Sequence, residues 1–165
     1  MRVPHSDLEE VQAATAPLWE DIRGKRLFLT GGTGFFGTWL LETFLHANRT
    51  LQLQAEVTVL TRNPAAFTAR APHLAQDPAL TLIEGDVRTF DFPPGEFPFV
   101  LHAATEASAW LTAHRPAEML STIAQGTERV LQFARQAATR NLLLTSSGAV
   151  YGLSLIHISE PTRPY

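Results

Sequence analysis

Cysteine is absent from the 165-residue sequence, and so is any long apolar run. Without cysteine there can be no disulfide, thiolate zinc site, iron–sulfur cluster or cysteine nucleophile. No stretch reaches the roughly 18 apolar residues of a membrane span. Acidic residues stand near the start, where a signal peptide would be basic and then apolar. We therefore expect a cytoplasmic protein that makes no membrane contact.

Charged residues are also few, at 18% of the chain, and neither sign dominates. Lysine and arginine together number 13 and aspartate and glutamate 16, which leaves a net charge of −3. This mildly acidic balance argues against a surface that follows the phosphates of a nucleic acid. Hydrophobic residues make up 45% of the chain, so we expect about one domain with its own core.

The first 24 residues predict a helical arm ahead of the main domain. Ser6 and Glu9 have the spacing of a capping box, and apolar residues follow at helical intervals. Pro17 lacks the N–H that an interior helical position donates, so we expect a break there, with a second helical piece opening at the proline. We interpret the arm as a packing element.

From residue 25 onward, short apolar runs alternate with helical patterns. The apolar runs predict strands at 26–30, 55–60, 80–87, 97–105 and 141–147. Helices are predicted at 38–47 and between Pro116 and Arg140, and prolines between the second and third strands predict a short helix with loops. Continuously apolar strands are typical of a parallel sheet that is buried on both faces. The predicted fold class is therefore α/β, a Rossmann-type doubly wound parallel sheet of about five strands with helices on both faces.

Three glycines, Gly31, Gly34 and Gly37, lie between the first strand and the first helix of this domain. Gly31 permits a tight turn, Gly34 lets a pyrophosphate approach the backbone, and Gly37 lets the helix pack close to the sheet. The helix N-terminus adds unpaired N–H groups and a partial positive charge. A nucleotide-triphosphate loop would need a lysine after the last glycine, where Thr38 stands. The turn predicts a dinucleotide site; a plain strand-to-helix connection is the alternative.

The residue after the second strand bears on which dinucleotide is bound. An Asp or Glu there normally meets a free ribose 2′-hydroxyl, but the sequence has Thr61, Arg62 and Asn63. Arg62 can pair with a 2′-phosphate, which would favour NADP, or stack on the adenine without selecting a cofactor. A solvated surface arginine is the third interpretation.

Four motifs occur in one order: TGGTGFFG at 30–37, GDV at 85–87, HAAT at 102–105 and TSSGAVYG at 145–152. With them, residues 25–152 resemble the extended short-chain dehydrogenase/reductases, and more narrowly the NAD-dependent epimerase/dehydratases that act on nucleotide sugars. The resemblance implies an enzyme that oxidises its sugar transiently with bound NAD, NADP being the alternative cofactor. It also implies a nucleotide-sugar substrate and a homodimer for the intact protein.

The resemblance further implies which residues border the cofactor. Those around the pyrophosphate would be Gly31, Thr33, Gly34, Phe35, Phe36 and Gly37. Those at the adenine and along the fourth strand would be Asp86, Val87, Ala103, Ala104 and Thr105. From the residues alone, Asp86 can equally cap a turn, and the two alanines can be small because a helix and a strand pack closely there.

Ser147 matches the family's catalytic Ser or Thr, whose hydroxyl hydrogen-bonds the sugar hydroxyl that reacts. The carboxyl end of a parallel strand suits that role, although a serine there can also only satisfy loop backbone groups. The family's base is a tyrosine followed four residues later by lysine, and Tyr151 is followed by Leu155. Since no such pair occurs, we expect this chain itself to be inactive. The six histidines are scattered, so no metal site is expected.

The last thirteen residues, 153–165, do not continue the preceding pattern. Their LSLIHISEPTR resembles the translation of a sequencing adapter, and a genuine divergent tail is the alternative. The expected organisation is thus a helical arm at 1–24, an incomplete Rossmann-type NAD(P)-binding domain at 25–152 and an adapter-derived tail. The fifth strand would then be an exposed edge beside uncovered apolar surface, which favours aggregation.

Two other functions remain open at this point. A noncatalytic NAD(P)-binding sensor or scaffold of the same fold would need no tyrosine and lysine pair. An NADP-dependent carbonyl reductase is suggested by Arg62. Within the preferred interpretation, epimerisation, dehydration and decarboxylation all fit the motifs.

Overall fold

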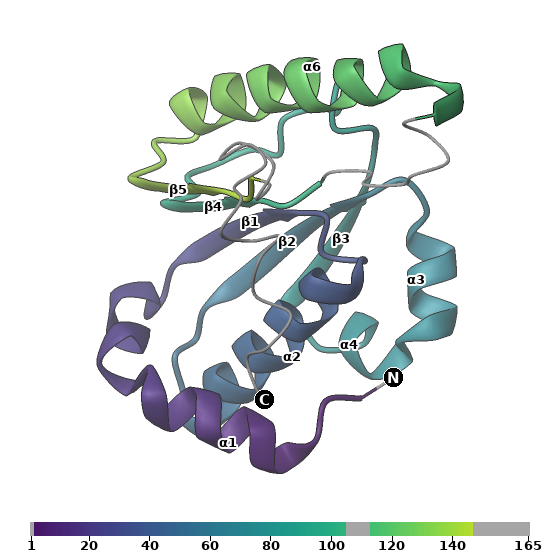
Figure 1. Ribbon diagram of the computed structural model, residues 1–165. Coiled ribbons are helices and arrows are strands. Elements are labelled where there is room, and N and C mark those ends of the chain that lie inside the picture. Colours follow the sequence, from purple (N-terminus) through teal and green to yellow (C-terminus); the bar gives the residue numbers. More distant parts are fainter. Residues whose placement is uncertain (1, 105–112, 147–165) are drawn as a thin grey trace, which may run out of the picture.

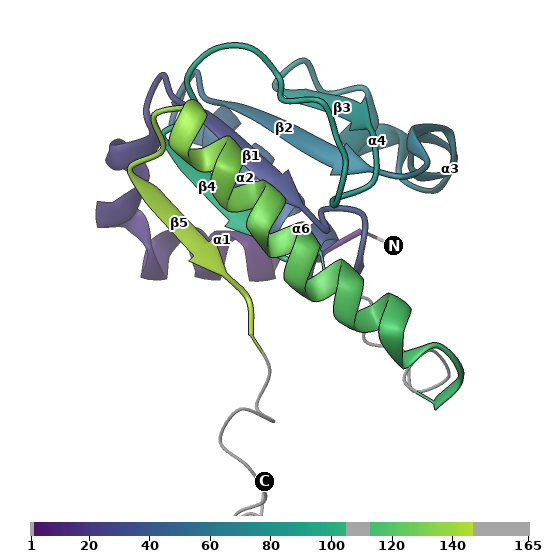
Figure 2. The same ribbon diagram turned by 90° about the horizontal axis from the view of Figure 1, so that it is seen from above.

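The computed structural model describes residues 2–104 and 113–146, which build one parallel sheet with helices on its two faces (Figures 1 and 2). The strands are β1 (Arg26–Thr30), β2 (Glu56–Thr61), β3 (Leu80–Glu84), β4 (Phe99–His102) and β5 (Asn141–Leu144). All pairings are parallel, and the strand order is β3-β2-β1-β4-β5. Strands β2 and β3 therefore lie on one side of β1, and β4 and β5 lie on its other side. The predicted doubly wound fold is confirmed.

Helices cover both faces of the sheet. The main ones are α2 (Phe35–Thr50), α3 (Pro64–Arg70), α4 (Pro72–Ala75) and α6 (Pro116–Gln136). Figure 1 shows α2 on the opposite face from α6, which crosses above the sheet. The helices α3, α4 and α6 each begin with a proline, at the first helical position, where a missing N–H costs nothing. In the described ranges, no helix combines the length and apolarity that crossing a membrane requires.

The protein has an apolar core on each face of the sheet, which explains why the strand sequences are continuously apolar. Successive strand residues point to opposite faces, so in β1 Phe28 and Leu29 enter different cores. Leu29 packs with Leu41 and Leu45 of α2, whereas Phe28 packs with Phe133 of α6. All five of these side chains are buried. Burial on both faces of the sheet thus follows from the two helical layers.

The arm consists of α1 (His5–Ala14) and a 3₁₀ helix, η1 (Ala16–Ile22). The break predicted at Pro17 is confirmed, with the proline in the first turn of η1. The capping box predicted from Ser6 and Glu9 is wrong. Pro4 occupies the N-cap and Ser6 already lies inside the helix, where its hydroxyl donates to the Asp7 carboxylate instead. The arm packs along α2, and its Leu8 is buried.

Several predicted boundaries shift by a few residues. The third strand ends at Glu84 rather than at 87, because the Asp86 carbonyl begins a turn by accepting from the N–H groups of Thr89 and Phe90. The fourth strand covers only Phe99–His102, since Phe97 instead donates its N–H to the carbonyl of Ala137. The helix after the glycine turn begins at Phe35, directly behind Gly34.

Strand β5 lies at an edge of the sheet, as expected, and all four of its residues are exposed. Leu142, Leu143 and Leu144 are the exposed apolar side chains here. An apolar edge strand offers unpaired backbone groups to another chain. This edge is therefore prone to association with another chain.

Replacing Leu143 by lysine is expected to reduce self-association. Leu143 is 59% exposed, so the change should alter the free energy of unfolding by no more than about 0.5 kcal/mol. A charged side chain on an edge strand opposes pairing with another edge. Sedimentation over a concentration series measures the effect, with Leu131→Lys on α6 as a control for an exposed leucine away from the edge. Equal association of the two variants would contradict a role for the edge.

Candidate functional site

A crevice of about 240 Å³ opens where the carboxyl ends of β1, β2 and β4 meet. It lies where the strand order reverses, which is where open α/β sheets bind ligands. Its lining includes the predicted site residues Gly31, Thr33, Gly34, Arg62, Asp86, Val87, Ala103 and Ala104. Residues that sequence reasoning missed also line it: Thr30, Leu60, Thr61, Gly85, Arg88, Glu118 and Thr122.

The glycine turn is closely packed at its two ends. Gly31 has a φ of +75°, which L side chains rarely adopt, and a Cβ there would overlap the backbone of Ala103. A Cβ on Gly37 would overlap the Gly31 carbonyl oxygen and the Gly32 backbone. These positions agree with the tight turn and the close helix packing expected from the sequence.

The middle of the turn is open. A Cβ on Gly34 would meet only the Gly31 carbonyl oxygen, at 3.4 Å. Gly34 is also the N-cap of α2, and it has no side chain with which to cap this helix. The first N–H groups of α2 are therefore available to an anion at the positive end of the helix. An open backbone beside an uncapped helix fits the pyrophosphate of a dinucleotide.

Phe35 and Phe36 are the first two residues of α2. Their rings stack edge to face on one another and are largely exposed. On the outer side of the turn, the Arg70 guanidinium of α3 donates to the Thr33 carbonyl oxygen. The glycine turn is thus held from α3 as well as from the sheet.

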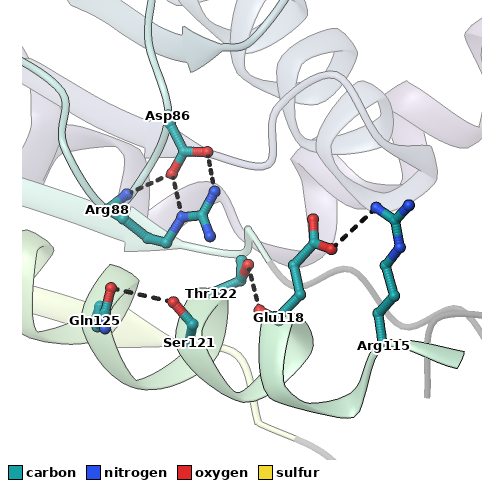
Figure 3. A network of polar contacts seen from close by, with 7 residues as sticks. All are labelled: Asp86, Arg88, Arg115, Glu118, Ser121, Thr122 and Gln125. Atoms are coloured by element: carbon teal, nitrogen blue, oxygen red, sulfur yellow. Dashed lines mark hydrogen bonds and ion pairs between the residues drawn. The ribbon is translucent and has the colours of Figure 1, made fainter. Parts of the chain in front are cut away.

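A charged pair occupies the turn after β3 (Figure 3). Asp86 Oδ1 accepts from the Arg88 backbone N–H at 2.9 Å and from Arg88 Nε at 2.8 Å, and Oδ2 accepts from Nη2 at 2.7 Å. The Arg88 side chain is the main reason that the pKa of Asp86 falls to about 2, and the charge of Arg62 adds to the effect. Asp86 does cap a turn, one of the two roles that its sequence left open.

At the end of β4, His102 joins the strand to β1 and α6. Its Nδ1 lies 2.6 Å from Thr30 Oγ1 and its Nε2 lies 3.3 Å from Thr127 Oγ1. Thr30 Oγ1 also accepts from the Ala104 N–H, so one threonine hydroxyl links His102 to the residues that follow β4. His102 is buried, and these contacts hold the end of β4 in place beside the crevice.

This histidine should make the fold less stable at mildly acidic pH. Burial lowers the pKa of His102 in the folded protein from its ordinary value of 6.5. As the pH falls through about 6.5, the unfolded chain takes up a proton that the folded chain refuses, so the free energy of unfolding falls. Full stability is expected above that pH.

Urea denaturation at about pH 7.5 and about pH 5.5 measures the loss. The difference between the two values should be smaller in His102→Gln than in the parent chain. Burial also lowers the pKa of His46, and the charges of His5 and Arg49 add to the effect. His46→Gln is therefore measured as well, so that the contribution of His46 to the loss of stability is separated from that of His102. An equal fall in His102→Gln and the parent would contradict this assignment.

Two predicted site residues, Thr105 and Ser147, lie outside the described residues. The structure brings the others together around one turn and one crevice. Arg88 could have been found, since an arginine two residues after an aspartate can reach its carboxylate. Glu118 and Thr122 carry no such signal, because they reach the crevice only through the placement of α6.

Comparison with known proteins places these features in a family. Residues 27–165 match the NAD dependent epimerase/dehydratase family. The chain is 29% identical over 140 residues to a UDP-glucose 4-epimerase from Rickettsia rickettsii (strain Sheila Smith), covering 82% of this chain and 40% of that protein. It is 30% identical over 135 residues to UDP-glucuronic acid decarboxylase 6 from Arabidopsis thaliana, covering 80% of this chain and 36% of that protein.

Solved structures share the fold. Pen from Bacillus thuringiensis superposes with a TM-score of 0.65 at 22% identity, over 79% of this chain and 40% of that one. A UDP-glucose 4-epimerase from Bifidobacterium longum, solved with NAD+ and UDP, gives a TM-score of 0.58 at 18% identity, over 78% and 38% of the two chains. The chain thus spans about 40% of the length of the curated relatives it matches.

Proposed function

The chain belongs to the NAD dependent epimerase/dehydratase family, and we propose that it carries the dinucleotide-binding part of an enzyme that transiently oxidises a nucleotide sugar. The observation that carries the proposal is the glycine turn, with its open Gly34 and the uncapped N-terminus of α2 at the crevice. Bound NAD would supply a hydride acceptor for the sugar. Epimerisation, dehydration and decarboxylation are the candidate outcomes.

In this proposal each part of the crevice has a distinct task. The N–H groups of Phe35, Phe36 and Gly37 hold the pyrophosphate, since they begin α2 beside Gly34. Asp86 accepts a hydrogen bond from the 6-amino group of adenine, next to Val87. Ala103 and Ala104 leave room for the cofactor because they have almost no side chain.

The remaining parts of the proposal concern two residues outside the described ranges, the substrate and the intact protein. Ser147 would hydrogen-bond the reacting sugar hydroxyl, and Thr105 would border the cofactor. A nucleotide sugar is proposed as substrate because the two curated relatives are named for UDP-glucose and UDP-glucuronic acid. The intact protein is proposed to be a cytoplasmic homodimer.

Calorimetric titration of the 165-residue chain with NAD+ tests the proposed site. We expect saturable binding, and we expect no conversion of UDP-glucose or UDP-glucuronic acid, because the sequence has no Tyr-x-x-x-Lys pair. Absence of binding would overturn the site. Sugar turnover by this chain would overturn the expected inactivity.

Arg62 favours a second candidate, an NADP-dependent carbonyl reductase, because it lines the crevice where an acidic residue would select NAD. On the preferred proposal, NAD+ binds at least as tightly as NADP+, and Arg62→Ala changes their affinity ratio little. Loss of a charge-assisted bond to a 2′-phosphate would instead weaken NADP+ roughly tenfold or more. A marked NADP+ preference that disappears in Arg62→Ala would favour the reductase.

A further inference from the structure

Arg88 holds both oxygens of the Asp86 carboxylate. Its Nε and Nη2 donate to Oδ1 and Oδ2 respectively, and its backbone N–H donates to Oδ1 as well. The two side chains are each about 30% exposed, at the wall of the crevice rather than on the open surface. Two parallel bonds from a planar guanidinium fix the plane of a carboxylate as well as its position.

The bonds to Arg88 leave Asp86 with acceptor capacity. An ionised carboxylate offers about four lone-pair positions, and Arg88 uses two on Oδ1 and one on Oδ2. The remaining position belongs to Oδ2. Because the low pKa of Asp86 keeps it ionised, it can only accept a hydrogen bond and cannot donate one.

Two purine bases differ in what they present to such an acceptor. Adenine carries a 6-amino group, which donates, whereas hypoxanthine carries a 6-oxo group, which accepts. An acceptor of fixed orientation favours the first and repels the second. A carboxylate that could turn freely would discriminate less, since it could move away from the oxo group.

We propose that Arg88 is a positioning residue that makes this site selective for adenine, by holding the Asp86 carboxylate so that Oδ2 accepts the 6-amino group of the base. The inference rests on the proposed function, because it needs a dinucleotide in the crevice. Arg88 acts through Asp86. The selectivity arises from the fixed direction of the acceptor.

Calorimetric titrations of the full chain with NAD+ and with nicotinamide hypoxanthine dinucleotide test the inference. The parent chain should bind NAD+ roughly tenfold more tightly than the hypoxanthine analogue. In Arg88→Gln this ratio should fall towards one, mainly through weaker NAD+ binding. Arg88→Lys should keep part of the ratio, because it retains the charge near Asp86 but loses the paired bonds.

Arg135→Gln, an exposed arginine in the last turn of α6, is the matched control and should keep the parent ratio. A merely structural loss in Arg88→Gln would weaken both dinucleotides equally and leave the ratio unchanged, which would overturn the inference. If Arg88→Gln does not fold, Arg88→Lys decides by the same ratio.

Failure of the parent chain to bind either dinucleotide would instead overturn the proposed function. Equal parent binding of the two would overturn adenine selection by Asp86.

Discussion

Replacing Gly37 by alanine is expected to lower the free energy of unfolding by about 3 kcal/mol and to abolish dinucleotide binding. The added Cβ would overlap the Gly31 carbonyl oxygen and the backbone of Gly32. Both obstacles are backbone atoms, so no side chain can move aside to make room. The start of α2 would have to move away from the turn, and with it the N–H groups proposed to hold the pyrophosphate. Urea denaturation measures the first effect and titration with NAD+ the second.

Gly34→Ala is the matched control for this prediction. Its Cβ would meet only the Gly31 carbonyl oxygen at 3.4 Å, an ordinary contact, so the free energy of unfolding should change by less than about 1 kcal/mol. The methyl group would nevertheless stand where the pyrophosphate is proposed to approach. Loss of NAD+ binding in a stable Gly34→Ala chain would show that the ligand site can be blocked without destabilising the fold. Unchanged NAD+ binding in Gly34→Ala would contradict the proposed position of the pyrophosphate.

Replacing Phe133 by alanine should lower the free energy of unfolding by about 3–5 kcal/mol. Its ring lies 4.5 Å from the ring of Phe28, 5.4 Å from Phe97 and 5.8 Å from Phe90, measured between centroids. The side chain is 1% exposed, so its removal leaves a cavity between α6 and the sheet. Phe28 belongs to β1, and Phe90 and Phe97 lie in the connection between β3 and β4. These rings cannot close the cavity without moving the backbone. Denaturant unfolding followed by circular dichroism measures the loss.

Leu131 provides the comparison on the same helix. It lies two residues from Phe133 on the outer side of α6 and is 52% exposed. Leu131→Ala should therefore change the free energy of unfolding by no more than about 0.5 kcal/mol. Similar losses in the two variants would mean that α6 does not pack on the sheet through Phe133.

Much of the sheet could be predicted from the sequence because its signals are local. Apolar runs with turn residues between them located all five strands, and the glycine spacing located the turn after β1. Boundaries were less predictable. Whether a residue extends a strand depends on its partner, as when Phe97 bonds Ala137 instead of a neighbouring strand. The predicted capping box was wrong because Ser6 can cap a helix only if the helix begins after it, and α1 begins at His5.

The order of elements, the buried strands and the glycine turn all follow from the sequence alone, since each depends on residues that are neighbours in the chain. Which side chains meet at the crevice depends on how the elements pack. Gly126 illustrates the reason: a Cβ there would lie 2.9 Å from Val87, so its absence lets α6 approach the turn after β3. That approach brings Glu118 and Thr122 to the crevice, which Gly85, Asp86 and Val87 also line although they stand more than 30 positions earlier in the chain. Such contacts are set by how closely two elements pack, which no local pattern contains.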